Sequence, residues 1–154
     1  MIKKCCFVFT IVLVLTLSGC GRSNYPELPD NAIAFEMGTL EDTEHDAALF
    51  GTLEYNGRIY IGYGTINNAF KNSDVNQCIG YVVMDENSTS NPDPNDMSIR
   101  IYTLYGDDDH KFLMEHDSAS GLMNQPSIWR AIDTRGKGID IPNYIDALEY
   151  DYWK

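Results

Sequence analysis

An Asn-Gly pair at residues 56 and 57 lies between two runs rich in β-branched and aromatic residues, Phe50 to Tyr55 and Arg58 to Tyr63. Both central positions of a tight two-residue turn need a positive φ, which asparagine and glycine tolerate better than other residues. The pattern therefore predicts a β-hairpin with Tyr55 opposite Arg58. Any fold of this chain has to accommodate that antiparallel pair.

Five further segments have the composition of strands. Each is rich in Ile, Val, Tyr or Phe and is bounded by Asn, Asp, Gly, Ser or Pro, which are typical of turns. Because strands that follow one another closely pair most simply with their neighbours, we expect an antiparallel meander of sequential hairpins. The segments are Ala32 to Thr39, Cys78 to Met84, Ser98 to Tyr105, Lys111 to His116 and Ser127 to Asp133.

Two short helical segments accompany these strands. One is a turn near Ser73 to Gln77, where Ser73 or Asp74 is a suitable cap, and the other extends from Pro142 to Leu148, where proline suits the first turn. The sequence therefore predicts a mostly β fold, a small antiparallel barrel or sandwich with one or two short helices.

The C-terminal end is too apolar for a frayed tail, so we expect its side chains to pack back onto the sheet. A partner-binding or disordered tail is the alternative. The residues concerned are Tyr144, Leu148, Tyr150, Tyr152 and Trp153.

The first 20 residues have the layout of a secretory signal: two lysines, an apolar run from Cys5 to Leu17, then small residues before a cysteine. The apolar run is shorter than the roughly 20 residues of a membrane-spanning helix. Leu17-Ser18-Gly19-Cys20 resembles the lipobox of bacterial lipoprotein precursors. The resemblance implies cleavage between Gly19 and Cys20 and a diacylglycerol thioether on Cys20. An ordinary signal peptide or an uncleaved anchor is the alternative.

This resemblance divides the chain into a signal peptide at residues 1–19, a lipidated cysteine and tether at 20–30, and one β-rich domain at 31–154. Removing 19 of the 154 residues leaves 135, which is the size of a single domain. The resemblance implies an envelope protein attached to the membrane through the lipid on Cys20. Because no Asp follows Cys20, it implies the outer membrane in a two-membrane bacterium and the outer face of the cell membrane in a one-membrane bacterium.

Three of the four cysteines, Cys5, Cys6 and Cys20, belong to the signal or the lipid site, which leaves Cys78 in the domain. The domain therefore has no partner for an intramolecular disulfide, and we expect no disulfide-linked partner protein. We interpret Cys78 as a small buried apolar side chain.

The domain is strongly acidic. The net charge of −12 becomes −14 once Lys3 and Lys4 leave with the signal. Such a surface repels the phosphates of nucleic acids and anionic lipid headgroups, so we expect no nucleic-acid partner and no membrane contact besides the lipid. It favours basic partners, although solubility alone also explains the charge.

Three loops concentrate carboxylates, and one of them contains Asp107, Asp108 and Asp109. Crowded carboxylate oxygens suit a hard cation such as Ca²⁺, but none of these loops has the spacing of an EF-hand. Solvated turns explain the same residues, because aspartate is a common turn former. We therefore expect no cofactor, and these three aspartates are the candidates for a calcium site.

No spacing typical of a catalytic site occurs in the chain. His116-Asp117-Ser118 is not a triad, because neighbours on a strand point to opposite faces. We therefore predict a non-enzymatic binding module that contacts a basic protein or another envelope component through its acidic surface and through Tyr102, Tyr105 and Trp129. The alternative is a surface hydrolase that cleaves glycan or peptide with loop carboxylates.

Overall fold

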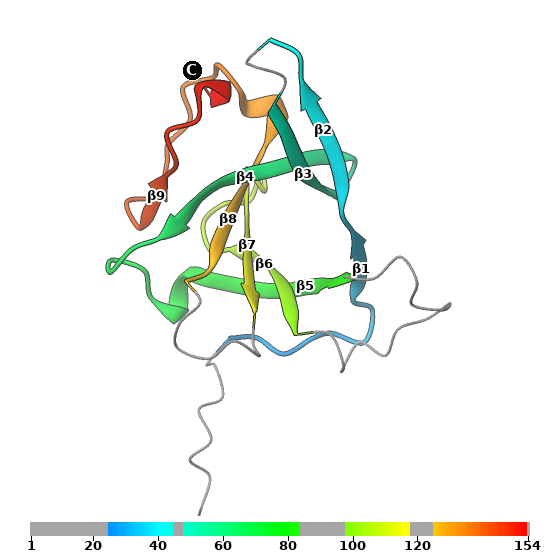
Figure 1. Ribbon diagram of the computed structural model, residues 1–154. Helices are drawn as coiled ribbons and strands as arrows, with labels where there is room; N and C mark the ends of the chain where they lie inside the picture. Colours follow the sequence, from blue (N-terminus) through cyan, green and yellow to red (C-terminus); the bar gives the residue numbers. More distant parts are fainter. Residues whose placement is uncertain (1–24, 45–47, 84–97, 118–124, 154) are drawn as a thin grey trace, which may run out of the picture.

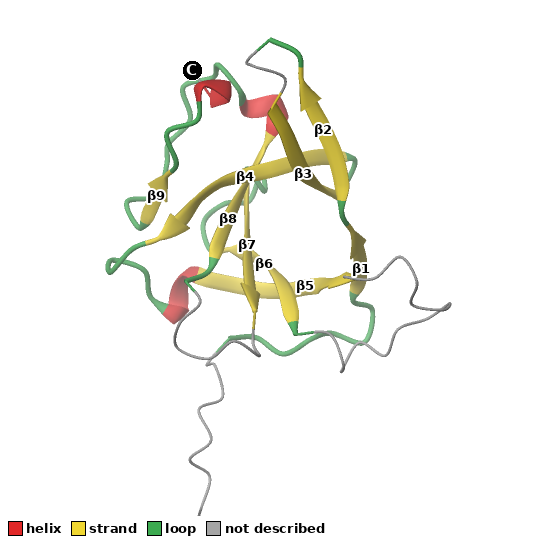
Figure 2. Cartoon of the chain, viewed as in Figure 1, coloured by secondary structure: helices red, strands yellow, loops and turns green. Residues whose placement is uncertain are grey.

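The computed structural model describes residues 25–44, 48–83, 98–117 and 125–153. The predicted export signal, the cleavage site between Gly19 and Cys20 and the lipid site lie outside these ranges and stay predictions. Within them the protein is mostly β, with a curled, half-barrel sheet and single 3-10 turns, which confirms the predicted fold class (Figures 1 and 2). No helix in these ranges is long and apolar enough to cross a membrane.

The described residues form one nine-stranded sheet. The predicted hairpin is β3 and β4, and Tyr55 lies opposite Arg58 as expected. Asn56 has a φ of 51° and Gly57 a φ of 70°, the left-handed conformations that the tight turn requires. The strands are β1 (Ile33–Glu36), β2 (Gly38–Asp42), β3 (Ala48–Tyr55), β4 (Arg58–Ile66), β5 (Val75–Val83), β6 (Ile99–Leu104), β7 (Phe112–Asp117), β8 (Ser127–Ala131) and β9 (Ile145–Ala147).

The strands do not follow the single meander that we expected. Their order is β1-β5-β6-β7-β8-β4-β3-β2, so two meanders are joined by the pairing of β8 with β4, and β9 pairs with β4 as well. β1 pairs with β5 in parallel. β1 and β2 stand at opposite ends of this order although only Met37 separates them in the chain. The predicted strand at Ala32 to Thr39 is therefore two strands, and the chain joins both ends of the curled sheet (Figure 1).

Neither predicted helical segment is an α-helix. The first is a 3-10 turn at Asn72–Asp74 that leads directly into β5. Neither Ser73 nor Asp74 occupies the cap position, which belongs to Lys71; Asp74 is the third residue of the turn, and its carboxylate accepts a hydrogen bond from the backbone N–H of Lys71 at 2.7 Å. The helix predicted from Pro142 to Leu148 is wrong, because this segment contributes β9, and its ladder with β4 outweighs a local helical preference.

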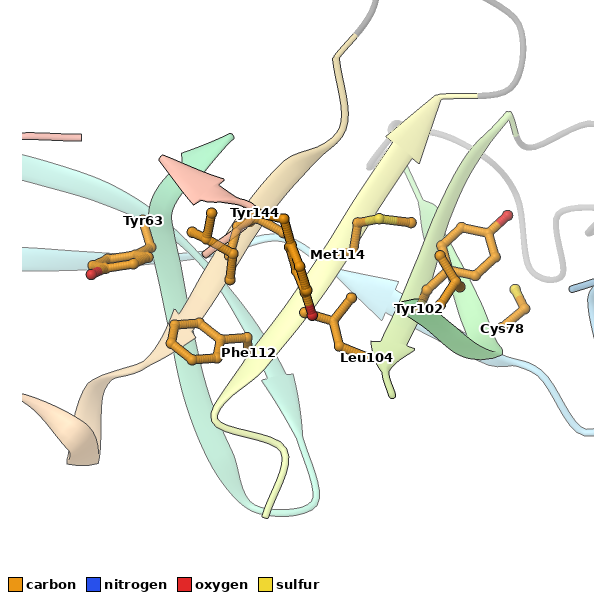
Figure 3. Close-up of a cluster of buried hydrophobic side chains, with 10 residues drawn as sticks. Tyr63, Cys78, Tyr102, Leu104, Phe112, Met114 and Tyr144 are labelled. Atoms are coloured by element: carbon orange, nitrogen blue, oxygen red, sulfur yellow. The ribbon is translucent and has the colours of Figure 1, made fainter. Parts of the chain in front are cut away.

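Buried side chains cover both faces of the curled sheet. Leu53, Tyr60 and Leu113 belong to a cluster to which β1, β3, β4, β5, β6, β7 and β8 all contribute, as expected for the concave interior. Phe112 and Met114 belong to a second cluster on the other face (Figure 3), against which Tyr25, Leu28 and Trp153 pack. Successive residues of β7 alternate between the clusters because neighbouring side chains on a strand point to opposite faces.

The C-terminal segment packs on the outer face, as its composition predicts. The ring of Tyr152 lies 5.3 Å from that of Phe50, and the ring of Trp153 lies 5.4 Å from that of Tyr63. The guanidinium of Arg130 stacks over Trp153 with its central carbon 4.4 Å from the ring centre. Tyr144, Tyr152 and Trp153 therefore pack on the sheet as predicted, whereas Leu148 remains 44% exposed and Tyr150 41% exposed.

Cys78 is buried in β5, which confirms the interpretation of this residue as a small core side chain. Burial also raises the pKa of its thiol. A protonated thiol is a poor nucleophile, so the environment of Cys78 suits packing and does not suit thiol chemistry.

Candidate functional site

The three aromatic residues predicted for partner contact do not lie together. Tyr102 is buried in β6 among the side chains of Figure 3, and burial raises its pKa well above the usual range. Trp129 belongs to the interior cluster and donates its indole N–H to Glu115 at 2.9 Å. Of the three, Tyr105 alone is exposed, with 74% of its surface accessible. Tyr102 and Trp129 therefore serve the two cores.

The predicted calcium loop is tied to the start of β7. The Asp107 carboxylate accepts the backbone N–H of Phe112 at 2.7 Å and lies 3.9 Å from the ammonium of Lys111. Asp108 and Asp109 are exposed, and the Asp109 carboxylate is 3.7 Å from the same ammonium. The part of the chain that the structure describes contains no group of three or more His, Cys, Asp or Glu side chains that could hold a metal. The calcium site stays a prediction.

The β3–β4 hairpin holds the same loop from the other side. The hydroxyl of Tyr60 donates to the carbonyl of His110 at 2.7 Å, and burial raises the pKa of Tyr60 to about 12. Arg58 donates to the His110 carbonyl at 3.0 Å and forms an ion pair with Asp133 at 2.7 Å. These contacts give the loop a structural explanation that requires no ligand.

An open pocket of about 410 Å³ lies where β1 diverges from β3. β2 pairs with β3 as far as Gly38 opposite Thr52, whereas β1 pairs with β5. Among the described residues, no ladder therefore joins β1 to the last part of β3. We name this pocket the β1–β3 seam. Its lining residues are Ala34, Phe35, Glu36, Met37, Gly38, Thr52, Leu53, Glu54 and Ile59.

The seam combines apolar surface with negative charge. Phe35 and Leu53 are almost fully buried beneath it, while Met37 remains 45% exposed and Ile59 39% exposed. Glu36 and Glu54 are exposed, and neither forms an ion pair with a described residue. Among the described residues that line the pocket, none is a lysine, an arginine or a histidine. This arrangement suits a ligand that carries both aliphatic groups and positive charge.

A second pocket, of about 300 Å³, continues along the same two strands. Ile33 precedes the first β1 residue of the seam, and Tyr55 follows the last β3 residue of the seam. Of the described residues in this lining, Glu27 is the charged one, so this part of the second pocket is also acidic. Its residues are Pro26, Glu27, Pro29, Asn31, Ile33, Tyr55, Gln77, Cys78 and Ile79.

Reasoning from sequence missed the seam. The stretch from Ala32 to Thr39 has the composition of one strand, and the break at Met37 has no turn residue before it. A weak signal was available, because Met37 is an apolar residue between Glu36 and Gly38. That signal does not show which strand lies across the gap.

No known protein family, curated protein or solved structure matches this chain. The geometry and the charge of the β1–β3 seam are therefore the features that point to a function.

Proposed function

We propose that this protein is a lipid-anchored binding module of the bacterial cell envelope and that it binds a basic polypeptide at the β1–β3 seam. The observation that carries this proposal is the combination, in one open pocket, of exposed Met37 and Ile59 with the carboxylates of Glu36 and Glu54, which form no ion pair with a described residue. Lysine and arginine match both features, because their aliphatic stems cover apolar surface while their charged ends reach carboxylates. The anchor rests on the lipobox resemblance of Leu17 to Cys20.

The charge of the whole chain supports the same class of partner. A protein with a net charge of −12 before any processing attracts cationic molecules over distances of about a Debye length. Complementary charge increases the rate of association more than it increases the final affinity. We therefore expect binding that is fast at low salt and weaker at high salt.

The seam is tested with lysozyme as a basic protein. We expect the purified full-length protein to bind lysozyme at low salt in a biosensor assay. The double variant Glu36→Gln with Glu54→Gln should bind roughly three to ten times more weakly, since each exposed ion pair contributes up to about 1 kcal/mol.

The matched control is Glu41→Gln with Glu149→Gln, which removes two exposed carboxylates that do not line the seam. This control should lose less than a factor of two. Equal losses in the two double variants would show that only the overall charge matters. The absence of lysozyme binding at low salt, together with no binding of a lysine-rich peptide, would refute the proposed function.

The anchor has its own test. Mass spectrometry of the protein isolated from bacterial membranes should find a chain that begins at Cys20 and carries the mass of acyl groups. A full-length chain, or a shorter chain that begins elsewhere without acyl mass, would refute the anchor and leave the seam proposal standing.

One observation favours testing the alternative, a surface hydrolase that acts on glycan or peptide. Glu36 and Glu54 line the same pocket, and hydrolysis of a glycosidic bond uses two carboxylates that face one substrate. An enzyme would cleave peptidoglycan fragments, and Glu36→Gln alone would stop the cleavage without stopping binding. If the protein is a binding module, neither the unsubstituted protein nor the Glu36→Gln variant would cleave the peptidoglycan fragments.

A further inference from the structure

One edge of β1 is open. On its other side β1 pairs with β5, and the carbonyl oxygen of Ile33 lies directly against Gly80 there. Because the main-chain polar groups of successive strand residues point to alternate edges, those of Ala34 and Glu36 point away from β5. Among the described residues, no main-chain hydrogen bond joins β1 to β3. The open edge therefore faces the seam.

The strand across the seam is open as well. β3 uses one edge to pair with β4, and its ladder with β2 ends at Thr52 opposite Gly38. Beyond Thr52, the edge of β3 that faces β1 has no strand partner in the described part of the chain. Two unpaired strand edges thus border one pocket whose buried base contains Phe35 and Leu53.

Natural sheets usually protect such edges with lysine, proline or a bulge, because an unpaired edge is a template for another strand. β1 has the sequence Ile33-Ala34-Phe35-Glu36 and contains none of these devices. Its charged residue is acidic, and Glu54 across the seam is acidic too. An acidic pair repels another acidic chain and accepts a basic one.

We propose that an extended, cationic polypeptide segment adds to β1 as a strand in the β1–β3 seam. This inference rests on the proposed function, because it specifies how the basic partner binds. The main chain of the segment hydrogen-bonds to Ala34 and Glu36. Its apolar side chains face the buried base of the seam, where Phe35 and Leu53 lie. Its basic side chains, which alternate with them, lie on the outer face, where their aliphatic stems cover Ile59 and their charged ends reach the carboxylates of Glu36 and Glu54. Main-chain bonds of this kind supply affinity, whereas side-chain contacts select the sequence.

Peptides test the main-chain component without any change to the protein. The first probe is a synthetic peptide of alternating lysine and valine, and the second is the same peptide with N-methyl groups on every other amide. Both have the same charge and side chains, but the second lacks the donors of one strand edge. We expect the methylated peptide to bind at least about ten times more weakly, as for the loss of two or more main-chain hydrogen bonds. A glutamate-valine peptide should not bind.

A variant tests the same contact from the protein side. Ala34→Pro removes one N–H from the open edge and leaves the donors that face β5 in place. Its matched control, Ala34→Thr, keeps that N–H in a residue suited to strands. We expect Ala34→Pro to weaken binding of the lysine-valine peptide about tenfold more than Ala34→Thr does. Thermal unfolding of both variants checks that the fold is retained, and the methylated peptide decides the question if Ala34→Pro does not fold.

The outcomes separate the two proposals. Weaker binding of the methylated peptide, together with slower hydrogen exchange at the amides of Ala34 and Glu36 in the complex, would support strand addition. Equal binding of the two peptides would refute strand addition and leave a basic ligand held by side chains. Binding of lysozyme without binding of the lysine-valine peptide would also refute strand addition. Failure of every basic probe would refute the proposed function itself.

Discussion

Trp129 donates its indole N–H to the carboxylate of Glu115 at 2.9 Å, from β8 to the neighbouring strand β7. The indole is 8% exposed, and burial raises the pKa of Glu115, an effect that the hydrogen bond from Trp129 opposes. Trp129, which the sequence suggests as a surface contact, is therefore buried in the interior, where Glu115 accepts its hydrogen bond. This pair shows how the fold changes the meaning of a residue that stands out in the sequence.

Two substitutions at Glu115 should have different effects on stability. Glu115→Ala leaves the indole N–H of Trp129 without its acceptor and should lower the free energy of unfolding by about 1–3 kcal/mol. Glu115→Gln retains an acceptor oxygen and should cost less at pH 7. Urea unfolding of both variants measures the difference. Equal losses would show that the hydrogen bond is not the stabilising contact.

The raised pKa of Glu115 also predicts how stability depends on pH. Because its pKa is higher in the folded protein than the ordinary 4.5, the folded state binds the proton more tightly. The stabilisation that the protonated Glu115 carboxyl contributes is complete below the pKa that Glu115 has in the unfolded chain. It is lost as the pH rises through the higher pKa that Glu115 has in the folded protein. The free energy of unfolding of Glu115→Gln, minus that of the unsubstituted protein, should therefore increase from pH 4 towards pH 7. A constant difference would contradict this account.

His116 should give a pH dependence of the opposite sign. Its ring lies 4.9 Å from that of Tyr25, and its Nδ1 is buried with no hydrogen-bond partner among the described residues. Burial lowers the pKa of His116, and the charge of Asp117 opposes that shift. Arg100 lies opposite His116 on β6. The neutral ring of His116 contributes fully to stability above the ordinary pKa of 6.5, which applies to the unfolded chain. This contribution is lost as the pH falls through the lower pKa that His116 has in the folded protein.

The variant His116→Phe keeps a ring against Tyr25 and removes the titration. Its free energy of unfolding, measured in urea between pH 8 and pH 5, should fall less steeply than that of the unsubstituted protein. Parallel pH profiles for the two proteins would show that His116 does not contribute.

Gly62 and Gly64 form a matched pair within β4. A Cβ on Gly64 would overlap the carbonyl oxygen of Asp146 in β9, whereas a Cβ on Gly62 meets no atom within 4 Å. Gly64→Ala should therefore displace β9 and cost about 1–3 kcal/mol, like other overpacked sites. Gly62→Ala should change stability by less than about 1 kcal/mol, because alanine also restricts the unfolded chain. Similar losses in the two variants would contradict the close approach of β9.

Arg130 should be sensitive to replacement by lysine. It is 5% exposed, its guanidinium stacks over Tyr63 and Trp153, and it donates to the hydroxyl of Thr134 at 2.8 Å and to its carbonyl at 2.9 Å. Lysine keeps the charge but loses the planar stacking and the forked donors. Arg130→Lys should therefore cost about 1–3 kcal/mol in urea unfolding.

The control for Arg130→Lys is Arg135→Lys. Arg135 stacks over Tyr152 at 4.3 Å, but its side chain is 28% exposed. Arg135→Lys should therefore lower the free energy of unfolding by less than about 1 kcal/mol. If Arg135→Lys lowered the free energy of unfolding more than Arg130→Lys does, the buried stacking of Arg130 on Trp153 would not be what stabilises the C-terminal segment.

Much of the local structure could be predicted from short stretches of sequence. The turn at Asn56 and Gly57, the register of Tyr55 with Arg58 and the burial of Cys78 depend on the conformational range or the apolar character of individual residues. The helix predicted after Pro142 failed because a local preference of less than about 1 kcal/mol per residue is outweighed by a strand partner.

The candidate site could not be predicted in this way. Glu36 and Glu54 are separated by many residues, and nothing in the composition around either one indicates that they line the same pocket. Tyr102 and Trp129 resembled contact residues because the sequence does not show which face of a strand is covered. Even when the bounds of a strand are predicted correctly, its sequence does not show which of its two faces is buried.

The sequence by itself determined the tight turn at Asn56 and Gly57 and most of the strands, because these depend on the dihedral preferences of neighbouring residues. Only the tertiary structure decided which strands became neighbours, which side chains entered the two cores, and that β1 and β2 diverge at Met37 to leave the seam open. The physical reason is that these features depend on pairing and packing between distant parts of the chain, whose free energy no local pattern contains.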